Sequence, residues 1–341
     1  MIDDTIGGDS MTCYKPNFMY IDKLAYPKIN RFVPHSKMND NFFNNLKELR
    51  MGEHLYPIPC GQCIGCRLDY SRNWANRAYL ESLNYKYNYF ITFTYNDENI
   101  PVGSSNNYSL RYDDFCKFLK RLRIYYKRKY NHTNIKYMVC GEYGSNSFRP
   151  HYHAIFFNLP IPDLSEDFSS IDENGFISIS QHRGIGSIYY FSQILNDIWD
   201  KGNILIGEAT WQSMAYVSRY IVKKQMGKSK DMYKILDIEP EFMHVSNGIA
   251  KDYFLANKDK IYELDNLNVL HNQAVTIKPP KYFDYLMQKE DDIFIQEVKK
   301  KRQESIDYIT NLKLYSASFN ELNERKEANK EIKARSLIRV L

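Results

Sequence analysis

The stretch Arg149-Pro150-His151-Tyr152-His153-Ala154-Ile155-Phe156-Phe157 decides how this chain is interpreted. The residues around its two histidines are mostly apolar or aromatic, which is typical of a buried strand. Because side chains i and i+2 of a strand point to the same face, His151 and His153 share one face and Tyr152 points to the other. Imidazoles about 6 to 7 Å apart along a strand can converge on one divalent ion if a third ligand lies nearby. The alternative is a pair of ordinary polar side chains on a solvent-facing sheet.

A carboxylate at the end of the preceding strand supplies that third ligand. Residues 135–142 have a strand-like pattern that ends at Glu142, and residues 144–150 form a turn. The resulting hairpin brings Glu142 close to the histidines. One carboxylate and two imidazoles suit Mg²⁺ or Mn²⁺ bound to a phosphate oxygen, with coordination positions left open for substrate. The alternative for Glu142 is a surface charge or an ion pair with Arg149.

Strand and helix patterns alternate around this hairpin. In chain order we expect a strand at 89–95, a helix capped by Ser109, strands at 135–142 and 151–157, a helix at 190–199, a strand at 203–206 and a helix capped by Thr210 at 211–225. The polar residues 160–186 are expected to form a long surface loop. This order predicts an α+β fold with a mainly antiparallel central sheet flanked by helices.

The pattern also divides the chain into three regions. Residues 1–82 hold a cysteine cluster and end in a helix, residues 84–228 form the central domain, and residues 229–341 are mixed and then helical. The charged helices at the C-terminal end are either plain solvated helices or a surface for a host replication helicase or polymerase, or for another copy of the chain.

The helix at 211–225 separates an apolar stripe from a tyrosine face. At about 100° per residue, Tyr216, Tyr220, Lys223 and Lys224 fall on one side of this helix. The apolar stripe lies elsewhere and consists of Met214, Val217 and Ile221. The helix can therefore dock on a sheet and still present two phenols and a lysine, whereas a core position for both tyrosines is the alternative.

A phenol next to a cation has a chemical use. A tyrosine oxygen can attack a DNA phosphodiester, which releases a 3′-hydroxyl and leaves a 5′-phosphotyrosine bond. A phenol has a pKa of about 10 and needs assistance at neutral pH. A metal ion that polarises the phosphate would provide part of it, and Lys223 or Lys224 would stabilise the developing charge. Two neighbouring tyrosines allow one to hold a DNA end while the other cuts.

Composition favours a folded chain without a membrane span. Apolar residues make up 43% of the 341 residues, and the net charge is only +5. The basic side chains are unevenly distributed, however, and residues 111–129 hold eight of them against two aspartates. Such a stripe attracts phosphate backbones or is simply a solvated helix face. Neither a secretory signal pattern nor an apolar run of about 18 residues is present, so we expect a cytosolic protein.

Three cysteines have metal-ligand spacing. Cys60, Cys63 and Cys66 form a C-x₂-C-x₂-C pattern, and Cys13 is a candidate fourth ligand for a structural Zn²⁺. An iron–sulfur cluster is a weaker interpretation because the usual fourth Cys-Pro is missing. Free thiols packed at a helix start are the remaining alternative.

Three motifs together resemble one family. They are Pro59-Cys60-Gly61-Gln62-Cys63-Ile64-Gly65-Cys66-Arg67, then Cys140-Gly141-Glu142-Tyr143-Gly144 followed by Arg149-Pro150-His151-Tyr152-His153-Ala154, and Tyr216-Val217-Ser218-Arg219-Tyr220-Ile221-Val222-Lys223-Lys224. In wording and order they resemble the replication initiators of gokushovirus-type Microviridae phages, which belong to the HUH endonuclease superfamily. The resemblance extends over about residues 11–300.

This resemblance implies the HUH fold and a rolling-circle replication initiator acting on single-stranded origin DNA in the cytoplasm of a bacterial host. His151 and His153 match the metal-binding pair of that family, and Glu142 stands where related initiators place an acidic ligand. Tyr216 and Tyr220 match its paired nucleophiles. The segment Phe93-Thr94-Tyr95 resembles its first motif, with a role in packing or origin contact. The family's usual start would correspond to Met11, so residues 1–10 would be an extension.

Candidate DNA contacts come from basic residues outside these motifs, namely Arg67, Arg72, Lys120, Arg123 and Arg149. Two other interpretations remain open. One is a relaxase or transposase of the same superfamily, and the other is a zinc-containing nucleic-acid-binding protein without catalysis.

Overall fold

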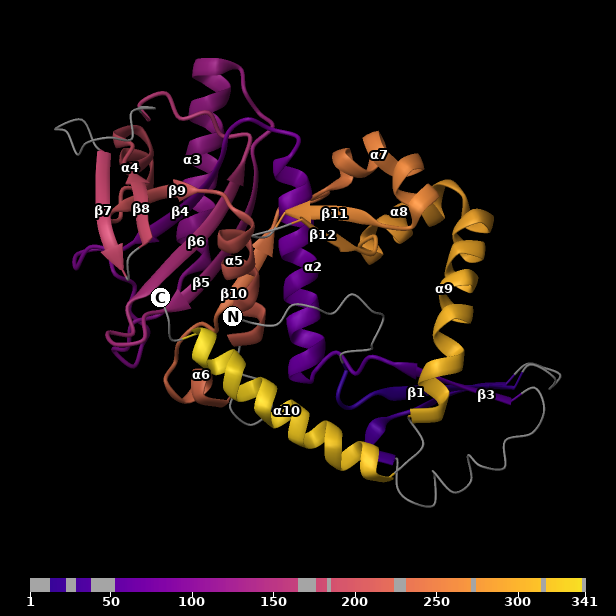
Figure 1. Cartoon of the computed structure of the whole chain (residues 1–341). Helices are drawn as coiled ribbons and strands as arrows, with labels where there is room; N and C mark the ends of the chain where they lie inside the picture. The colour runs from indigo at the N-terminus through magenta and orange to yellow at the C-terminus, as the bar shows by residue number, and fades with distance from the viewer. Residues whose placement is uncertain are drawn as a thin grey trace. The chain divides into compact units, whose positions relative to one another are not determined.

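The computed structural model of the chain describes residues 13–22, 29–37, 53–164, 176–182, 185–223, 231–270, 274–313 and 317–338 (Figure 1). The expected N-terminal extension, residues 1–10, lies outside this part. The chain divides into two compact units, one formed by residues 1–70 with 280–341 and the other by residues 71–279. The division into regions 1–82, 84–228 and 229–341 stays a prediction.

The larger unit is built on a seven-stranded sheet within the described residues. In spatial order its strands are β10 (Phe242–Val245), β5 (Lys136–Tyr143), β6 (Pro150–Phe157), β4 (Asn88–Thr94), β9 (Ile204–Glu208), β8 (Ile185–Tyr190) and β7 (Phe176–His182). Every neighbouring pair runs antiparallel. The predicted α+β fold with a mainly antiparallel sheet and flanking helices is therefore confirmed, and the histidine strand β6 lies inside the sheet.

The predicted surface loop at 160–186 is wrong in its second half. Residues 176–182 form β7, and β8 begins at Ile185, so both strands extend the sheet. The sequence Phe176-Ile177-Ser178-Ile179-Ser180 alternates apolar and polar residues, as a half-buried strand does. The Ser/Asp-rich residues before it hid this short alternation.

Helices cover both faces of the sheet. They include α2 (Ile64–Ser82), α3 (Tyr112–Tyr130), α4 (Gln193–Trp199) and α5 (Trp211–Lys223). One face packs on α3, where Phe93 and Phe156 of the sheet meet Phe115 and Phe118, all four fully buried. The other face packs on α5, whose Met214 and Val217 are fully buried with sheet residues such as Ile155 and Phe157. Because strand side chains alternate, β6 separates these two cores.

The two predicted helix caps have different outcomes. Thr210 does cap α5, because its hydroxyl accepts a hydrogen bond from the Ser213 amide at 3.2 Å. Ser109 does not cap α3, which begins at Tyr112, and its hydroxyl instead accepts the Glu239 amide at 3.0 Å. The tertiary contact to Glu239 takes the oxygen that a cap would need.

Tyr152, the residue between the two histidines, anchors the start of α3. It is fully buried, and its hydroxyl donates to the Arg111 carbonyl at 2.8 Å and accepts the Arg111 amide at 3.1 Å. Its oxygen also lies 2.7 Å from the Tyr95 hydroxyl, which donates to Asp114 at 3.0 Å. The expectation that Tyr152 points away from the histidine face is confirmed, and its burial explains why a large aromatic side chain fits there.

The other elements complete the two units. The larger unit also contains α6 (Asp231–Ile235), α7 (Lys251–Leu264) and the hairpin of β11 (Leu267–Leu270) and β12 (Ala274–Ile277). The smaller unit contains a sheet of β1 (Asn17–Asp22), β2 (Ile29–Val33) and β3 (Glu53–Ile58), the short helix η1 (His35–Lys37), and the helices α8 (Lys281–Glu290), α9 (Asp292–Lys313) and α10 (Ala317–Ile338). The predicted helical C-terminal region is confirmed. No helix in the described part of the chain has both the length and the apolar character that crossing a bilayer requires.

Candidate functional site

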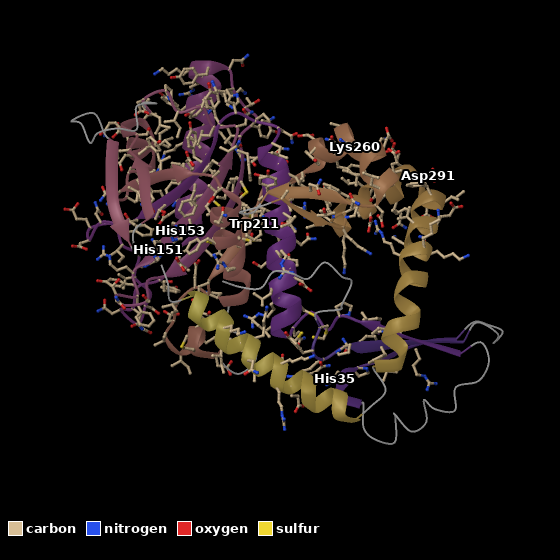
Figure 2. The ribbon with its side chains drawn as sticks, viewed as in Figure 1. His35, His151, His153, Trp211, Lys260 and Asp291 are labelled. Atoms are coloured by element: carbon tan, nitrogen blue, oxygen red, sulfur yellow. The ribbon has the colours of Figure 1, made fainter. Side chains whose placement is uncertain are left out.

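The hairpin of β5 and β6 brings Glu142 to the two histidines, as predicted. Glu142 is the register partner of His151, and both strands direct these side chains to the α5 face of the sheet (Figure 2). The Oε1 atom of Glu142 lies 2.8 Å from Nε2 of His151 and 3.0 Å from Nε2 of His153. The three ligand atoms lie within 4.8 Å of one another, so one cation can contact all of them.

The second nitrogen of each imidazole is held by a neighbour that orients the ring. Nδ1 of His151 lies 3.2 Å from the Arg149 carbonyl oxygen, and Nδ1 of His153 lies 2.9 Å from the Thr92 hydroxyl. A carbonyl oxygen only accepts, so Nδ1 of His151 carries a proton and neutral His151 directs the lone pair of Nε2 at the Glu142 oxygen. Two facing lone pairs require a positive charge between them, which a second proton or a metal ion supplies. This arrangement of outer partners is typical of histidines that bind metals.

Aromatic rings enclose His153 on two sides. The Phe90 ring is stacked on its imidazole, with centroids 5.4 Å apart and an interplanar angle of 9°. The Tyr216 ring meets the same imidazole edge-on at 5.0 Å and 85°. These contacts restrict the ring to one orientation and exclude water from one side of the cluster.

Glu142 is held as a carboxylate although it is buried. Its side chain is only 6% exposed. Burial by itself raises the pKa of Glu142, but hydrogen bonds from His151 and His153 and their positive charge outweigh it, so that its pKa lies below the ordinary value. The carboxylate is therefore charged and available as a ligand at neutral pH.

Helix α5 places one phenol directly at this cluster. The Tyr216 hydroxyl donates to Oε1 of Glu142 at 2.9 Å and lies 3.4 Å from Nε2 of His153. The predicted apolar stripe docks the helix, and the Trp211 indole fixes its first turn by donating to Asn76 at 2.9 Å (Figure 2). Tyr220 and Lys223 belong to α5, but their side chains, like all of Lys224, lie outside the described residues.

The four predicted cysteine ligands form a second cluster, in the smaller unit. Cys13 precedes β1, Cys60 follows β3, and Cys63 and Cys66 stand at the beginning of α2. Their sulfur atoms all lie within 4.8 Å of one another, with Cys13 to Cys63 at 3.8 Å and Cys60 to Cys66 at 4.0 Å. Tetrahedral zinc with Zn–S bonds of about 2.3 Å separates its sulfurs by about 3.8 Å, so the donor set fits that ion.

Backbone amides support thiolates in this cluster. Sulfur atoms accept the amide of Cys60 at 3.2 Å, that of Cys63 at 3.3 Å and that of Tyr14 at 3.4 Å. A hydrogen bond from the Cys13 thiol lowers the pKa of Cys63, because the bond favours its charged form. Preformed acceptor geometry around the sulfurs is the structural requirement for a bound cation.

The five predicted DNA contacts do not converge on the histidine cluster. Lys120 and Arg123 are exposed on α3, which covers the opposite face of the sheet. Arg149 donates to Asp97 at 2.6 Å and to the Tyr95 carbonyl at 3.0 Å, so its guanidinium holds a strand end. On α2, Arg67 is half-buried and Arg72 is exposed. A role for any of them in DNA binding stays a prediction.

Two residues at the site were missed by the sequence interpretation. Thr92 and Phe90 belong to β4, where Thr92 is the register partner of His153. Attention went to Phe93-Thr94-Tyr95, but Phe93 and Tyr95 point into the α3 core. The alternation along β4 signals which residues share a face, yet only the register between β4 and β6 brings Thr92 to the histidine.

We expect Thr92→Val to weaken metal binding while preserving the fold. Valine has nearly the volume of threonine but cannot hydrogen-bond to Nδ1 of His153, so the imidazole loses its orienting partner. Removing such outer partners costs about 10- to 100-fold in metal affinity. Calorimetric titration with Mn²⁺ measures this loss, and Thr92→Ser, which keeps the hydroxyl, should restore most of the affinity. An unchanged Mn²⁺ affinity in Thr92→Val would show that the hydroxyl does not position His153.

Fold and site together define an α+β protein with a candidate divalent-metal centre beside a tyrosine. A family model whose description begins "Replication-associated protein ORF2" matches residues 88–225, which contain this centre. The chain is 38% identical over 302 residues to "Replication-associated protein ORF2" of Spiroplasma virus 4, covering 86% of each chain. It is 36% identical over 172 residues to "Replication-associated protein VP4" of Bdellovibrio phage phiMH2K, covering 50% of this chain and 49% of that protein.

A third relative, "Replication-associated protein ORF4" of Chlamydia phage 1, is 28% identical over 289 residues and covers 81% of this chain and 67% of its own length. No solved structure matches the chain. The chain belongs to the family of replication-associated proteins of Microviridae-type phages, as its motifs predicted.

Proposed function

We propose that this protein starts rolling-circle replication by nicking single-stranded origin DNA in the cytoplasm of the phage's bacterial host. In this proposal the fold is that of the HUH endonucleases, and Glu142, His151 and His153 hold Mg²⁺ or Mn²⁺. The observation that carries it is the position of the Tyr216 hydroxyl, 2.9 Å from the carboxylate that also accepts hydrogen bonds from both imidazoles. A bound divalent ion would polarise the scissile phosphate beside that hydroxyl.

The tyrosine then acts as the nucleophile. Its oxygen forms a bond to phosphorus, the bond from phosphorus to the 3′ oxygen breaks, and this oxygen takes up a proton to become the free 3′-hydroxyl. The DNA 5′ end stays attached as a phosphotyrosine, so the energy of the phosphodiester is conserved for rejoining. Tyr220, one turn further along α5, is proposed as the second nucleophile of the cycle, and Lys223 or Lys224 as the group that stabilises charge on the phosphate.

The cysteine cluster has a structural role in this proposal. Zn²⁺ held by Cys13, Cys60, Cys63 and Cys66 joins the start of β1, the end of β3 and the start of α2. Soft thiolates suit Zn²⁺ and the oxygen and nitrogen ligands of the histidine cluster suit Mg²⁺ or Mn²⁺, so the two clusters select different ions. The helices of the C-terminal region are proposed to contact a host replication helicase or polymerase.

A covalent-adduct assay tests the proposed function. Labelled single-stranded oligonucleotides that tile the genome carrying this gene are incubated with the protein and Mg²⁺ or Mn²⁺. We expect one tile, or a few overlapping tiles, to give a band shift that survives boiling in detergent. EDTA added beforehand should abolish the adduct, because the phosphate is then no longer polarised.

The same assay separates the rival functions. A zinc-containing protein that only binds nucleic acid would give complexes that dissociate in detergent for every tile. A relaxase or transposase would form the adduct at a transfer site or at an insertion-sequence end, and not at a site that supports synthesis of circular phage DNA. The absence of any detergent-stable adduct would refute the nicking proposal.

A further inference from the structure

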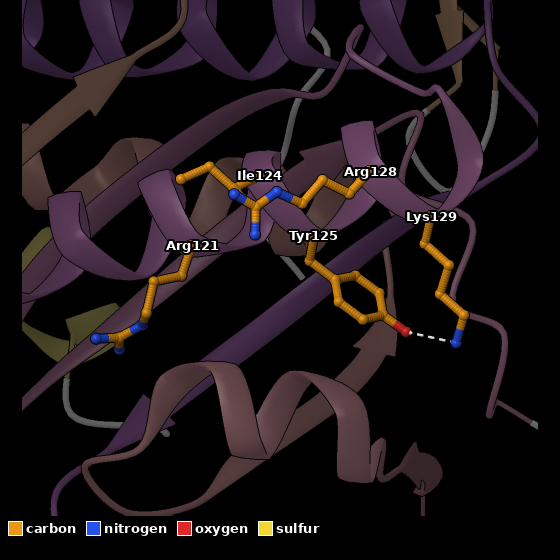
Figure 3. Close-up of a pocket in the computed structure, with 5 residues that line it drawn as sticks. All are labelled: Arg121, Ile124, Tyr125, Arg128 and Lys129. Atoms are coloured by element: carbon orange, nitrogen blue, oxygen red, sulfur yellow. Dashed lines mark hydrogen bonds between the residues drawn. The ribbon is translucent and has the colours of Figure 1, made fainter.

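A pocket on α3 is not used by the proposed nicking reaction. It has a volume of about 450 Å³ and is lined by Arg121, Ile124, Tyr125, Arg128 and Lys129 (Figure 3). These positions follow the spacing i, i+3, i+4, i+7 and i+8, so they form one face of the helix. The face combines three cations with one aliphatic and one aromatic side chain.

We propose that this α3 pocket is a second binding site for single-stranded DNA. A nucleobase would lie against Ile124 and Tyr125, and neighbouring phosphates would contact Arg128 and Lys129. The pocket is independent of the metal centre, and it rests on the proposed function only in the choice of DNA as the occupant.

The charge of the helix favours a polyanion. Among the described residues, no carboxylate pairs with the exposed cations of α3, which are Lys120, Arg123, Lys127, Arg128 and Lys129. Arg121 is different, because it donates to Asp200 at 2.8 Å and to the carbonyls of Ile198 and Trp199 at 2.9 and 3.0 Å. Arg121 is therefore a fixed wall of the pocket, while the other cations are available for phosphates.

The aromatic side chains favour an unstacked strand over a duplex. Lys129 donates to the Tyr125 hydroxyl at 3.0 Å, and its ammonium lies 5.3 Å from the Tyr125 ring centre and 5.5 Å from that of Tyr130 (Figure 3). Ile124 and Tyr130 are each 41% exposed, which is unusual for large apolar side chains unless they meet a partner. Aromatic platforms next to cations bind single strands because every base has a flat face, whereas duplex bases are already stacked.

The pocket lies on the far side of the sheet from the histidines. Helix α3 packs on the face that carries Phe93, Tyr152 and Phe156, whereas His151 and His153 share the α5 face. The strand attached at Tyr216 and the strand in this pocket are therefore held at separate places. The pocket can retain a DNA segment while the metal centre cuts or rejoins another.

The test measures binding of fluorescein-labelled oligothymidylate to the full chain in EDTA, where nicking does not contribute. The pocket variant is Arg128→Gln with Lys129→Gln, and its matched control is Lys251→Gln with Lys260→Gln, two exposed lysines of α7. We expect the slope of log affinity against log salt to become shallower by about 1.4 in the pocket variant, because two phosphate contacts are lost. The control, which loses the same charge, should keep the wild-type slope.

A second pair of variants tests the stacking surface. Tyr125→Leu keeps apolar bulk but removes the ring, and we expect affinity to fall by about 5- to 150-fold. Tyr125→Phe keeps the ring and should bind within about twofold of wild type, which separates stacking from the hydrogen bond to Lys129. Circular dichroism melting confirms that both variants are folded.

The outcomes separate this site from the nicking centre. Equal slopes for pocket and control variants, or equal binding by Tyr125→Leu and Tyr125→Phe, would overturn the pocket, as expected if α3 instead met a protein. Failure of the nicking proposal would appear elsewhere, as the absence of a detergent-stable adduct from the wild type. The pocket variant should still form that adduct with a short origin oligonucleotide, because its metal centre is unchanged.

Discussion

Replacing both Tyr216 and Tyr220 by phenylalanine is expected to reduce the covalent protein–DNA adduct to background, a loss of more than about 10³-fold. The change removes two oxygen atoms and leaves the apolar docking residues Met214 and Val217 in place, so α5 should remain folded. Without a phenol no phosphotyrosine bond can form, whatever the metal centre does. The measurement is detergent-resistant labelling of the protein by the oligonucleotide that the wild type attacks.

Single variants show how the two phenols share the reaction. Tyr216→Phe should still form some adduct if Tyr220 can replace it, and the reverse should hold for Tyr220→Phe. Tyr285→Phe on α8 is the matched control, because it removes an exposed phenol outside α5 and should react like the wild type. Undiminished labelling of the double variant would show that neither tyrosine is the nucleophile.

Cys63→Ser is expected to have the second large effect, on metal content and on the integrity of the smaller unit. The wild type should contain one zinc ion per chain by elemental analysis, and Cys63→Ser should contain almost none. Structural zinc contributes about 10 to 16 kcal/mol of apparent binding free energy that is absent without the ion. Loss of the cluster should therefore release the start of β1 and the end of β3 and make this unit sensitive to limited proteolysis.

The matched control for this prediction is Cys116→Ser, which changes a half-buried cysteine of α3 that belongs to neither metal-ligating cluster. It should retain zinc and protease resistance. Iron together with visible absorbance would favour an iron–sulfur cluster, and no bound metal in freshly purified wild type would contradict a metal role for the four cysteines.

Local sequence patterns predicted most of the central sheet because each pattern is completed within a few residues. The alternation in β4 and β6 and the apolar stripe of α5 identify these elements without knowledge of the rest of the chain. The prediction of a loop over residues 160–186 failed because β7 and the start of β8 lie beside polar residues that outweigh their short alternation. The cap at Ser109 failed because Glu239, distant in sequence, competes for the same hydroxyl.

The candidate metal ligands could be named from the sequence because they lie on two strands joined by one turn. A hairpin fixes the pairing of Glu142 with His151 locally, so no distant part of the chain is needed. The four cysteines were likewise recognised by spacing and by the family's motif. Thr92 could not be found in this way, because the chain between β4 and β6 contains α3 and β5.

The order of residues along the chain alone determined the α+β pattern, the hairpin that gathers Glu142, His151 and His153, and the helix face that carries Tyr216. These features depend on strand alternation, helical periodicity and a short turn, all of which act over a few residues. Only the tertiary structure decided that Thr92 and Phe90 hold His153, that the Tyr216 hydroxyl reaches Glu142, and that the basic face of α3 lies behind the sheet. Those contacts join segments far apart in the chain, and they form because buried apolar faces pack on both sides of one sheet.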